Sequence, residues 1–368
     1  MKVNCTKENL YKSLDLVSHV ASKSSNLPIL SNVLLRVKNG IIELISTDLE
    51  IGIKSLVRGK IETEGEFTIP ATLFSNYINL LQKEKIEIFL QDKEIIIKTE
   101  DSTTKIKGEN SEEFPILPEI NKNKSVSVEA EDFKKAITQI IFATAQDETR
   151  PEISGVYFKF SGQELIVAAT DSYRLAEKKI KLKQAVENKT ELILPSKTLQ
   201  ELLRIISINQ TKTVDIYLDE NQIMFVCDET ELISRIIEGQ YPDYTQLIPA
   251  DFKTNVSLDR NDFIKVIKTS SLFTKSGVND IVLSVRPEEK ILVVESTNNQ
   301  LGENIAKIEA GVTGEECKIV FNYRYLLDGL GATSADEIIL SVNDANSPGL
   351  IKSKTEDKYI YIIMPIRQ

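Results

Sequence analysis

The sequence has no tryptophan, one histidine and three cysteines, and these scarcities exclude several kinds of site. Because His19 is the single histidine, catalytic triads and metal sites that need two or three imidazoles are excluded. Cys5, Cys227 and Cys317 lie far apart and form no C-x-x-C pair, so neither a zinc site nor a disulfide framework is predicted. We expect three reduced thiols and no bound metal.

Long hydrophobic runs and phosphate-binding loops are also missing. The longest apolar runs, such as residues 165–169, are far shorter than the ~20 residues that a membrane helix needs. The opening MKVNCTKENLYKSLDL has no apolar signal segment. We therefore expect a cytoplasmic protein with no membrane partner. Neither G-x-x-x-x-G-K-[ST] nor G-x-G-x-x-G occurs, so no nucleotide-type cofactor is predicted.

Composition and charge limit the number of domains and the classes of protein that remain possible. With 368 residues, 41% hydrophobic and 27% charged, the chain is predicted to fold into two or three domains. The net charge of −10 disfavours a protein that wraps its outer surface around nucleic acid. The 55 carboxylates include no pair that stands out from the acidic background, so we expect no catalytic residue.

Three segments resemble one another along the chain. NCTKENLYKSLDLVSHVA, SVEAEDFKKAITQIIFATA and SLDRNDFIKVIKTSSLFT each have a strand-like lead, polar residues typical of a helix start, and apolar residues at helical spacing. Leu10, Phe133 and Phe263 hold matching places, at intervals of 123 and 130 residues. The chain is therefore predicted to contain three repeats.

Two further units recur in the same order. A strand, an Asx-rich turn and a strand follow one another around Thr47, Thr170 and Thr297. A strand runs into a second helix at Pro70, Pro195 and Asn322. The linkers EEFPILPEI and GQYPDYTQLIPA match as well, and they predict domains at 1–124, 125–253 and 254–368.

The segments between these landmarks predict the fold class. Short runs rich in Ile, Val, Tyr and Thr have the length of strands, so each repeat is predicted to hold two helices and about eight strands. The helices fall at fixed places among antiparallel strands, which indicates an α+β fold with both helices of a repeat on one face of its sheets.

Five motifs in order resemble the bacterial DNA sliding clamp family, the beta subunits of DNA polymerase III, over the whole chain. They are LPIL (27–30), TDLE (47–50), ATDSYRLA (169–176), YPDY (241–244) and MPIR (364–367). The resemblance implies a head-to-tail homodimer, a ring of six similar domains with helices lining the hole. It also implies a non-catalytic processivity factor for DNA replication. Such a ring slides on duplex DNA and recruits the polymerase, the ATP-dependent clamp loader and repair proteins.

Sequence-independent sliding requires contacts to phosphates. In the six predicted helix segments, eleven basic residues stand against eight acidic ones, a modest excess that predicts weak and salt-dependent binding. The side chains predicted to face DNA are Lys12, Lys23, Lys134, Lys197, Arg204 and Lys265. A solvated charged face is the alternative for each of them. Some family members carry an arginine just before LPIL, where this chain has KSSN.

The resemblance further implies a pocket for partner peptides between the second and third domains. The matching positions are Ile153, Thr170, Tyr173, Arg174, Leu175, Pro242, Leu247, Ile362, Ile363, Met364, Pro365, Ile366 and Arg367. Apolar groups suit Leu or Phe anchors, and the two arginines can orient a peptide. Tyr173 and Gln246 replace a histidine and an arginine of some relatives, so a shifted peptide preference is expected. Interdomain packing alone is the alternative.

The head-to-tail contact would pair an edge strand of the first domain with one of the third. By resemblance, the dimer interface includes Thr104, Lys105, Ile106, Lys107, Leu272 and Phe273. Ordinary packing is again the alternative. Two other functions stay open: a monomeric three-domain protein that binds a ligand or peptide without encircling DNA, and an enzyme based on carboxylates that converge from different repeats.

Overall fold

The predicted helix segments form helices, and several begin at side-chain caps which the sequence supplies, whereas the helix after Pro70 has none. A computed structural model describes residues 1–21, 27–122, 125–147, 149–275, 277–355 and 358–367. Thr6 Oγ1 accepts a hydrogen bond from the Asn9 N–H at 3.3 Å, and the Asp259 carboxylate accepts one from the Asp262 N–H at 2.9 Å. The α-helices are α1 (Lys7–Ser18), α2 (Ala71–Leu80), α3 (Ala130–Ile140), α4 (Pro151–Ser154), α5 (Ser196–Asn209), α6 (Arg260–Ser271) and α7 (Tyr323–Gly331). Short 3-10 turns are η1 (Pro28–Ser31), η2 (Ser111–Glu113), η3 (Ile141–Ala143) and η4 (Thr245–Leu247).

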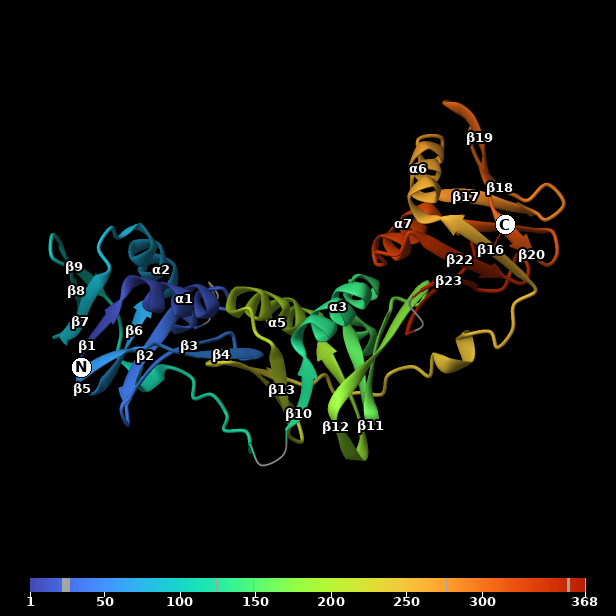
Figure 1. Ribbon diagram of the computed structural model, residues 1–368. Helices are drawn as coiled ribbons and strands as arrows, with labels where there is room; N and C mark the ends of the chain where they lie inside the picture. Colours follow the sequence, from blue (N-terminus) through green and yellow to red (C-terminus); the bar gives the residue numbers. More distant parts are fainter. Residues whose placement is uncertain (22–26, 123–124, 148, 276, 356–357, 368) are drawn as a thin grey trace. The chain divides into compact units, whose positions relative to one another are not determined.

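The chain, whose helices and strands are labelled in Figure 1, divides into two units whose boundaries cut through the middle repeat. Unit 1 comprises Met1–Glu131 and Lys197–Ile236, and unit 2 comprises Asp132–Ser196 and Ile237–Gln368. Each unit contains two sheets, and all strand pairings between the described strands are antiparallel.

Unit 1 is built on a five-stranded and an eight-stranded sheet. The five-stranded sheet has the order β5 (Gly59–Thr63), β1 (Lys2–Thr6), β7 (Lys85–Gln91), β8 (Glu94–Lys98), β9 (Thr103–Lys107). The eight-stranded sheet has the order β10 (Val126–Glu129), β13 (Thr213–Leu218), β14 (Gln222–Cys227), β15 (Thr230–Arg235), β4 (Ile51–Leu56), β3 (Ile41–Thr47), β2 (Asn32–Lys38), β6 (Gly65–Pro70). The eight-stranded sheet therefore crosses from the second repeat to the first.

Unit 2 is built on a seven-stranded and a four-stranded sheet. The seven-stranded sheet has the order β11 (Gly155–Thr170), β12 (Arg174–Pro195), β24 (Tyr359–Ile363), β23 (Gly349–Ser353), β22 (Glu337–Val342), β16 (Thr254–Asp259), β20 (Gly311–Thr313). The four-stranded sheet has the order β19 (Gly302–Glu309), β18 (Ile291–Asn298), β17 (Asp280–Arg286), β21 (Cys317–Asn322). The described part of the middle repeat has fewer strands than predicted, because β11 and β12 are continuous over 16 and 22 residues.

Two inter-repeat strand pairings have the same register. At the first junction β4 pairs with β15, with Ile51 opposite Ser234 and Gly52 opposite Ile233. At the second junction β12 pairs with β24, with Arg174 opposite Ile363 and Leu175 opposite Ile362. Because Thr47 and Thr170 precede these strands by equal distances, the two junctions are equivalent position for position.

The repeat positions also agree in the cores. Leu10, Phe133 and Phe263, which the sequence placed at matching points, are all fully buried on the inner faces of α1, α3 and α6. Burying such a side chain stabilises a fold by about 1.5–3 kcal/mol, so each helix is held on its sheet by this equivalent position. No helix in the described ranges is long and apolar enough to cross a membrane.

The predicted Asx turns are formed. Asp48 Oδ1 accepts the Ile51 N–H at 2.8 Å, and Asp171 Oδ1 accepts the Arg174 N–H at 3.0 Å. These bonds start β4 and β12 at defined residues, and they set the register of both junctions.

Candidate functional site

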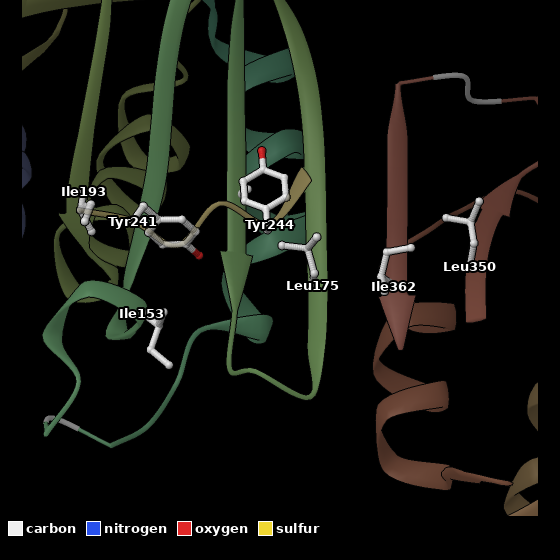
Figure 2. Close-up of a cluster of buried hydrophobic side chains, with 8 residues drawn as sticks. Ile153, Leu175, Ile193, Tyr241, Tyr244, Leu350 and Ile362 are labelled. Atoms are coloured by element: carbon white, nitrogen blue, oxygen red, sulfur yellow. The ribbon is translucent and has the colours of Figure 1, made fainter. Parts of the chain in front are cut away.

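Eight buried side chains form one hydrophobic cluster at the second junction (Figure 2). They come from α4, β11, β12, β23, β24 and the second linker (residues 237–253): Ile153, Ala168, Leu175, Ile193, Tyr241, Tyr244, Leu350 and Ile362. The predicted pocket residues Ile153, Leu175 and Ile362 all lie in this cluster, and the last two are direct partners across β12 and β24. These positions thus come together although some of them are separated by more than two hundred residues of chain.

Other predicted pocket residues reach the surface of unit 2 to different extents. Tyr173 and Leu247 have exposed fractions of 63% and 48%, which are high for large apolar groups. Met364, Pro365 and Ile366 are half-buried, whereas Pro242 and Arg367 are exposed. The Met364 N–H donates to the Tyr173 carbonyl at 2.9 Å, and the Ile366 N–H donates to the Val320 carbonyl at 2.8 Å. These bonds hold the C-terminal segment along β12 and β21, beside the exposed aromatic side chain.

Thr170 and Ile363 lie in the interior of this region rather than on its surface. Both side chains are buried. Thr170 Oγ1 donates to the Arg174 carbonyl at 2.7 Å and closes the turn before β12.

Arg174 is already fully engaged inside unit 2. Its Nε donates to Asp171 Oδ2 at 2.9 Å, its Nη1 to Asp328 Oδ2 at 2.5 Å and its Nη2 to the Phe142 carbonyl at 3.0 Å. The guanidinium also lies 4.5 Å from the centre of the Tyr325 ring. Burial works to lower the pKa of Arg174, but Coulomb interactions with Tyr361 and Asp171 and hydrogen bonds to Asp328 and Asp171 raise it overall. Arg174 therefore joins β12 to α7.

The second linker is anchored by a buried hydrogen bond. Tyr244 Oη donates to Glu177 Oε2 at 2.6 Å. Burial and the neighbouring Glu177 carboxylate raise the pKa of Tyr244 far above its ordinary value, so the phenol stays a donor. Tyr157 stacks on Tyr241 at 5.0 Å and meets Tyr244 edge to face at 6.1 Å.

Sequence reasoning missed Tyr325 and Asp328, which belong to the same region. The Tyr325 ring stacks on the exposed Tyr173 at 6.4 Å, and Asp328 holds Arg174. Both sit on α7, in the third occurrence of the strand-to-helix unit. Matching Asp328 with Glu201 through the repeat could have identified it, because Glu201 also binds an arginine.

Two of the predicted DNA-facing cations have partners within unit 1. Arg204 Nη1 and Nη2 donate to the carbonyls of Asp15 and Leu16 at 3.0 and 2.5 Å, at the C-terminal end of α1. Its Nε donates to Glu201, which also accepts from His19 Nδ1. Lys197 Nζ lies 2.5 Å from Asp48 Oδ2. These side chains join α5 to the first repeat, and DNA would have to compete with those partners.

The remaining predicted cations are more available. Lys12 on α1 and Lys265 on α6 are exposed, and Lys134 on α3 is half-buried. Lys265 Nζ lies 2.9 Å from Asp262 Oδ1, one turn earlier on the same helix, and this hydrogen bond raises the pKa of Lys265. Lys23 lies outside the described residues. Lys83, counted with the second helix, lies beyond the end of α2, a helix with no charged residue.

Two edge strands occupy junction positions without a neighbour. β9 ends the first repeat as β15 ends the second and β24 the third, and β19 follows the third Asx turn as β4 and β12 follow the others. Among the described strands, β9 pairs only with β8, and β19 pairs only with β18. Predicted interface residues Thr104, Lys105, Ile106 and Lys107 all lie on β9. Leu272, with an exposed fraction of 69%, follows α6, and the half-buried Phe273 comes next.

Comparison with known proteins covers the whole chain. Family models for the DNA polymerase III beta subunit match residues 1–118 (N-terminal domain), 127–243 (central domain) and 245–367 (C-terminal domain). The beta sliding clamp of Bacillus subtilis is 31% identical over 378 residues, with both chains covered completely. That of Synechococcus elongatus is also 31% identical, over 100% of this chain and 99% of the relative.

Solved structures agree with the sequence matches. The DNA polymerase sliding clamp from Bacillus subtilis superposes with a TM-score of 0.94 at 30% identity, covering 100% of this chain and 99% of that one. The sliding clamp from Pseudomonas aeruginosa bound to griselimycin gives a TM-score of 0.94 at 26% identity, with both chains covered completely.

Proposed function

The chain belongs to the DNA polymerase III beta subunit family, the bacterial sliding clamps, and from this premise we propose which of its residues close the ring, face DNA and bind partners. As a member it is a non-catalytic processivity factor of DNA replication. The working form is a homodimeric ring around duplex DNA. We place it in the cytoplasm, where a bacterial chromosome is replicated, and propose domain boundaries at 1–124, 125–253 and 254–368.

The unpaired junction strands carry the proposal for ring closure. Inside the chain, the strand that follows an Asx turn pairs with the last strand of the next repeat at both junctions. The same rule applied to the third repeat pairs β19 with β9 of a second copy. Two such pairings close a ring of two chains, which is a closed symmetry that leaves neither strand exposed.

Charge and hydrophobicity of the two edges fit each other. Lys105 and Lys107 are exposed on β9, and β19 exposes Glu303, Lys307 and Glu309, so β9 carries positive charge and β19 a net negative charge. Ile305 on β19 is 59% exposed, an unusual exposure for a strand residue of this size. Opposite charges and an apolar contact across the new strand pair both favour association. A monomeric three-domain protein would give these features no role.

A charge-swap experiment tests this closure. One variant carries Lys105→Glu with Lys107→Glu, and the other carries Glu303→Lys with Glu309→Lys. Either variant alone brings like charges together at both contacts of its homodimer, so each is expected to be a monomer at low salt. Their mixture places opposite charges at both contacts and is expected to recover a dimer.

Light scattering at several salt concentrations measures the outcome. A matched control swaps charges at Lys159 and Glu164, which lie on β11 and not on β9 or β19, and should leave the dimer intact. Dimers of both single variants at low salt, or a mixture that stays monomeric, would reject the proposed pairing.

For DNA, we propose that Lys12, Lys134 and Lys265 make mobile phosphate contacts, and we keep Lys23, which lies outside the described residues, as a further candidate. Arg204 and Lys197 contribute mainly by holding α5 and the first repeat together, and add positive potential to the helix surface. A small number of cations at least partly open to solvent fits a protein that must hold DNA without stopping on it.

For partners, we propose that short peptides bind over the cluster at the second junction. Tyr173 and Leu247 offer exposed apolar surface, the half-buried Met364 lies with them, and Pro242, Pro365, Ile366 and Arg367 border it. Large apolar anchors of a peptide would contact Tyr173, Leu247 and Met364, while the exposed Arg367 would meet its polar groups. The replicative polymerase, the clamp loader and repair proteins would share this one site. The griselimycin complex of the Pseudomonas aeruginosa relative supports a ligand site on this fold.

A further inference from the structure

The first linker (residues 108–122) lies over the first junction. Its large apolar residues and its prolines recur at every third position. Phe114, Leu117 and Ile120 are spaced by three, and so are Pro115 and Pro118. Phe114 and Ile120 are buried and Leu117 is half-buried, whereas Ile116 between them is 94% exposed. One face of the segment is therefore turned to the protein and the other to solvent.

This periodicity is that of a polyproline II helix, which has three residues per turn. Phe114 has φ −73° and ψ 129°, which is close to that conformation. Within the described chain, residues 115–120 make no backbone hydrogen bond, as expected of a helix type that has none internally. The polyproline II conformation, and not pairing with a strand, thus turns the apolar side chains of the segment toward the protein.

The floor beneath the segment comes from both repeats. Phe114 packs with Ile29, Leu34 and Ile45 of the first repeat. Ile120 packs with Met224 and Ile233 of the second repeat. Leu117 packs against both groups, so the three anchors bridge the first junction.

Gly52 makes room for the central anchor. A Cβ atom at Gly52 would lie 2.4 Å from Cδ2 of Leu117, closer than real atoms approach. The equivalent position of the second junction is Leu175, whose side chain fills its own cluster. The first junction is therefore shaped to receive a side chain that its own β4 does not supply.

A cavity of about 420 Å³ remains beside the linker, lined by Ile45, Phe114, Leu117, Met224 and Ile233 among others. The cations on its wall are already neutralised. Arg36 pairs with Glu43 at 2.7 Å, and Glu231 accepts both Lys54 at 2.8 Å and Lys122 at 2.6 Å. The wall thus has a charged part, which also includes Glu66 and Glu119, and an apolar part formed by the five residues named first, which an apolar anchor would contact.

We propose that the first junction carries a binding groove for an extended peptide with apolar side chains at every third position, and that residues 114–120 are its resident, exchangeable occupant. The groove is related by the repeat to the partner site of the second junction, but it binds a segment of the same chain. Attachment gives the linker a high effective concentration, of order millimolar, so it excludes the same sequence added in solution. This inference does not depend on where partner peptides bind.

The test uses a fluorescein-labelled peptide EEFPILPEI, which copies residues 112–120. It is titrated into the full chain and into a variant with Phe114→Ser and Leu117→Ser, and anisotropy reports binding. The variant should bind at least about tenfold more tightly than the unchanged chain, because its own linker competes poorly. Bound peptide should also raise the melting temperature of the variant and leave that of the unchanged chain where it was. Ile116→Ser, on the solvent face, is the matched control and should behave like the unchanged chain.

A second variant covers the case in which the double substitution prevents folding. Leu117→Ser alone removes the central anchor of the linker and leaves Gly52 and the rest of the groove unchanged, so it should also admit the labelled peptide. Equal binding to the unchanged chain and to Leu117→Ser overturns the proposal, as does an absence of binding to every variant. So does equal binding of the peptide EEPFILPEI, in which the aromatic anchor is moved by one position.

Discussion

The first and second junctions share one strand register but close their outer faces with different chemistry. At the first, Gly52 lies opposite Ile233, and the linker covers the pair with Leu117. At the second, Leu175 lies opposite Ile362, and the linker is fixed beside them by the hydrogen bond from Tyr244 to Glu177. The first junction is thereby covered by the chain itself, whereas the second leaves Tyr173 and Leu247 exposed for a partner.

The helix sides of the two junctions differ as well. At the first, Arg204 on α5 reaches the C-terminal carbonyls of α1. At the second, Arg174 on β12 reaches Asp328 on α7, and Gln139 Nε2 on α3 donates to the Ala332 carbonyl at 3.0 Å. One repeated architecture therefore uses different residues to fix its helices, while the sheet register is kept. Backbone pairing sets the position of the repeats, and side chains are free to specialise.

The largest expected effect comes from removing the arginine tie of the second junction. Arg174→Ala leaves Asp171 and Asp328 without their partner and the Phe142 carbonyl without its donor. The free energy of unfolding of unit 2 should fall by about 3 kcal/mol. Hydrogen exchange of β12 and β24 followed by mass spectrometry measures the loss. Arg150→Ala, which removes a half-exposed arginine at 3.5 Å from Glu152, should change it by less than about 0.5 kcal/mol. Equal losses of stability in Arg174→Ala and Arg150→Ala would refute the claim that Arg174 stabilises the second junction.

Truncating the exposed pocket surface should weaken partner binding without loosening the junction. Tyr173→Ala or Leu247→Ala should each lower the affinity for a Leu- and Phe-containing partner peptide by about tenfold. Fluorescence titration gives the affinity, and an unchanged melting curve shows that the fold is intact. Ile116→Ser removes an even more exposed apolar side chain at the first junction and should leave the affinity unchanged. Loss of affinity in that control would mean that partners use both junctions.

Removing the Tyr244 hydroxyl should show whether the second linker is held by its hydrogen bond to Glu177 or by aromatic packing. Tyr244→Phe keeps the ring contacts and leaves Glu177 Oε2 without its donor, so unit 2 should lose about 1–2 kcal/mol of unfolding free energy. The second linker should exchange its amide hydrogens faster, while the first linker does not change. Unaltered exchange in residues 237–253 would show that aromatic packing alone holds this linker.

The smallest expected effect is a loss of stability at low pH. It should appear in unit 1, at the first junction. Burial works to raise the pKa of Glu231, but hydrogen bonds from Lys122 and Lys54 lower it below its ordinary value of 4.5 overall. A lowered folded-state pKa gives stability that is present above the unfolded value and is lost as the pH falls through the folded value. Denaturant unfolding of unit 1 should therefore weaken below about pH 4.5 by at most about 1 kcal/mol. Glu231→Gln should remove that part of the pH dependence, and an unchanged profile would argue against it.

Much of the fold could be predicted because its signals are local. Apolar periodicity, caps such as Thr6 and Asp259, and the Asx turns at Asp48 and Asp171 act within a few residues, and each forms as expected. The merging of short strands into β11 and β12 was not predicted, because strand ends depend on what pairs alongside them.

The site was harder to predict because its partners come from distant repeats. Arg204 and Lys197 read as free cations in the sequence, yet they bind carbonyls of α1 and the Asp48 carboxylate, which lie more than a hundred residues away. Tyr325 joins the pocket region only because α7 packs beside the turn before β12. Periodicity identifies which face of an element is buried, but it cannot say which side chain of another repeat will meet it.

The most direct test of the central claim is retention on DNA of defined topology. The protein is loaded onto nicked circular duplex DNA by its ATP-dependent loader, the salt concentration is raised, and bound protein is counted before and after the circle is cut. A closed ring predicts that the protein stays on the circle at high salt and is lost once the DNA has ends, because phosphate contacts alone are screened. Equal loss from circular and linear DNA as salt rises, or equal retention on both, would contradict a ring that holds DNA by encircling it.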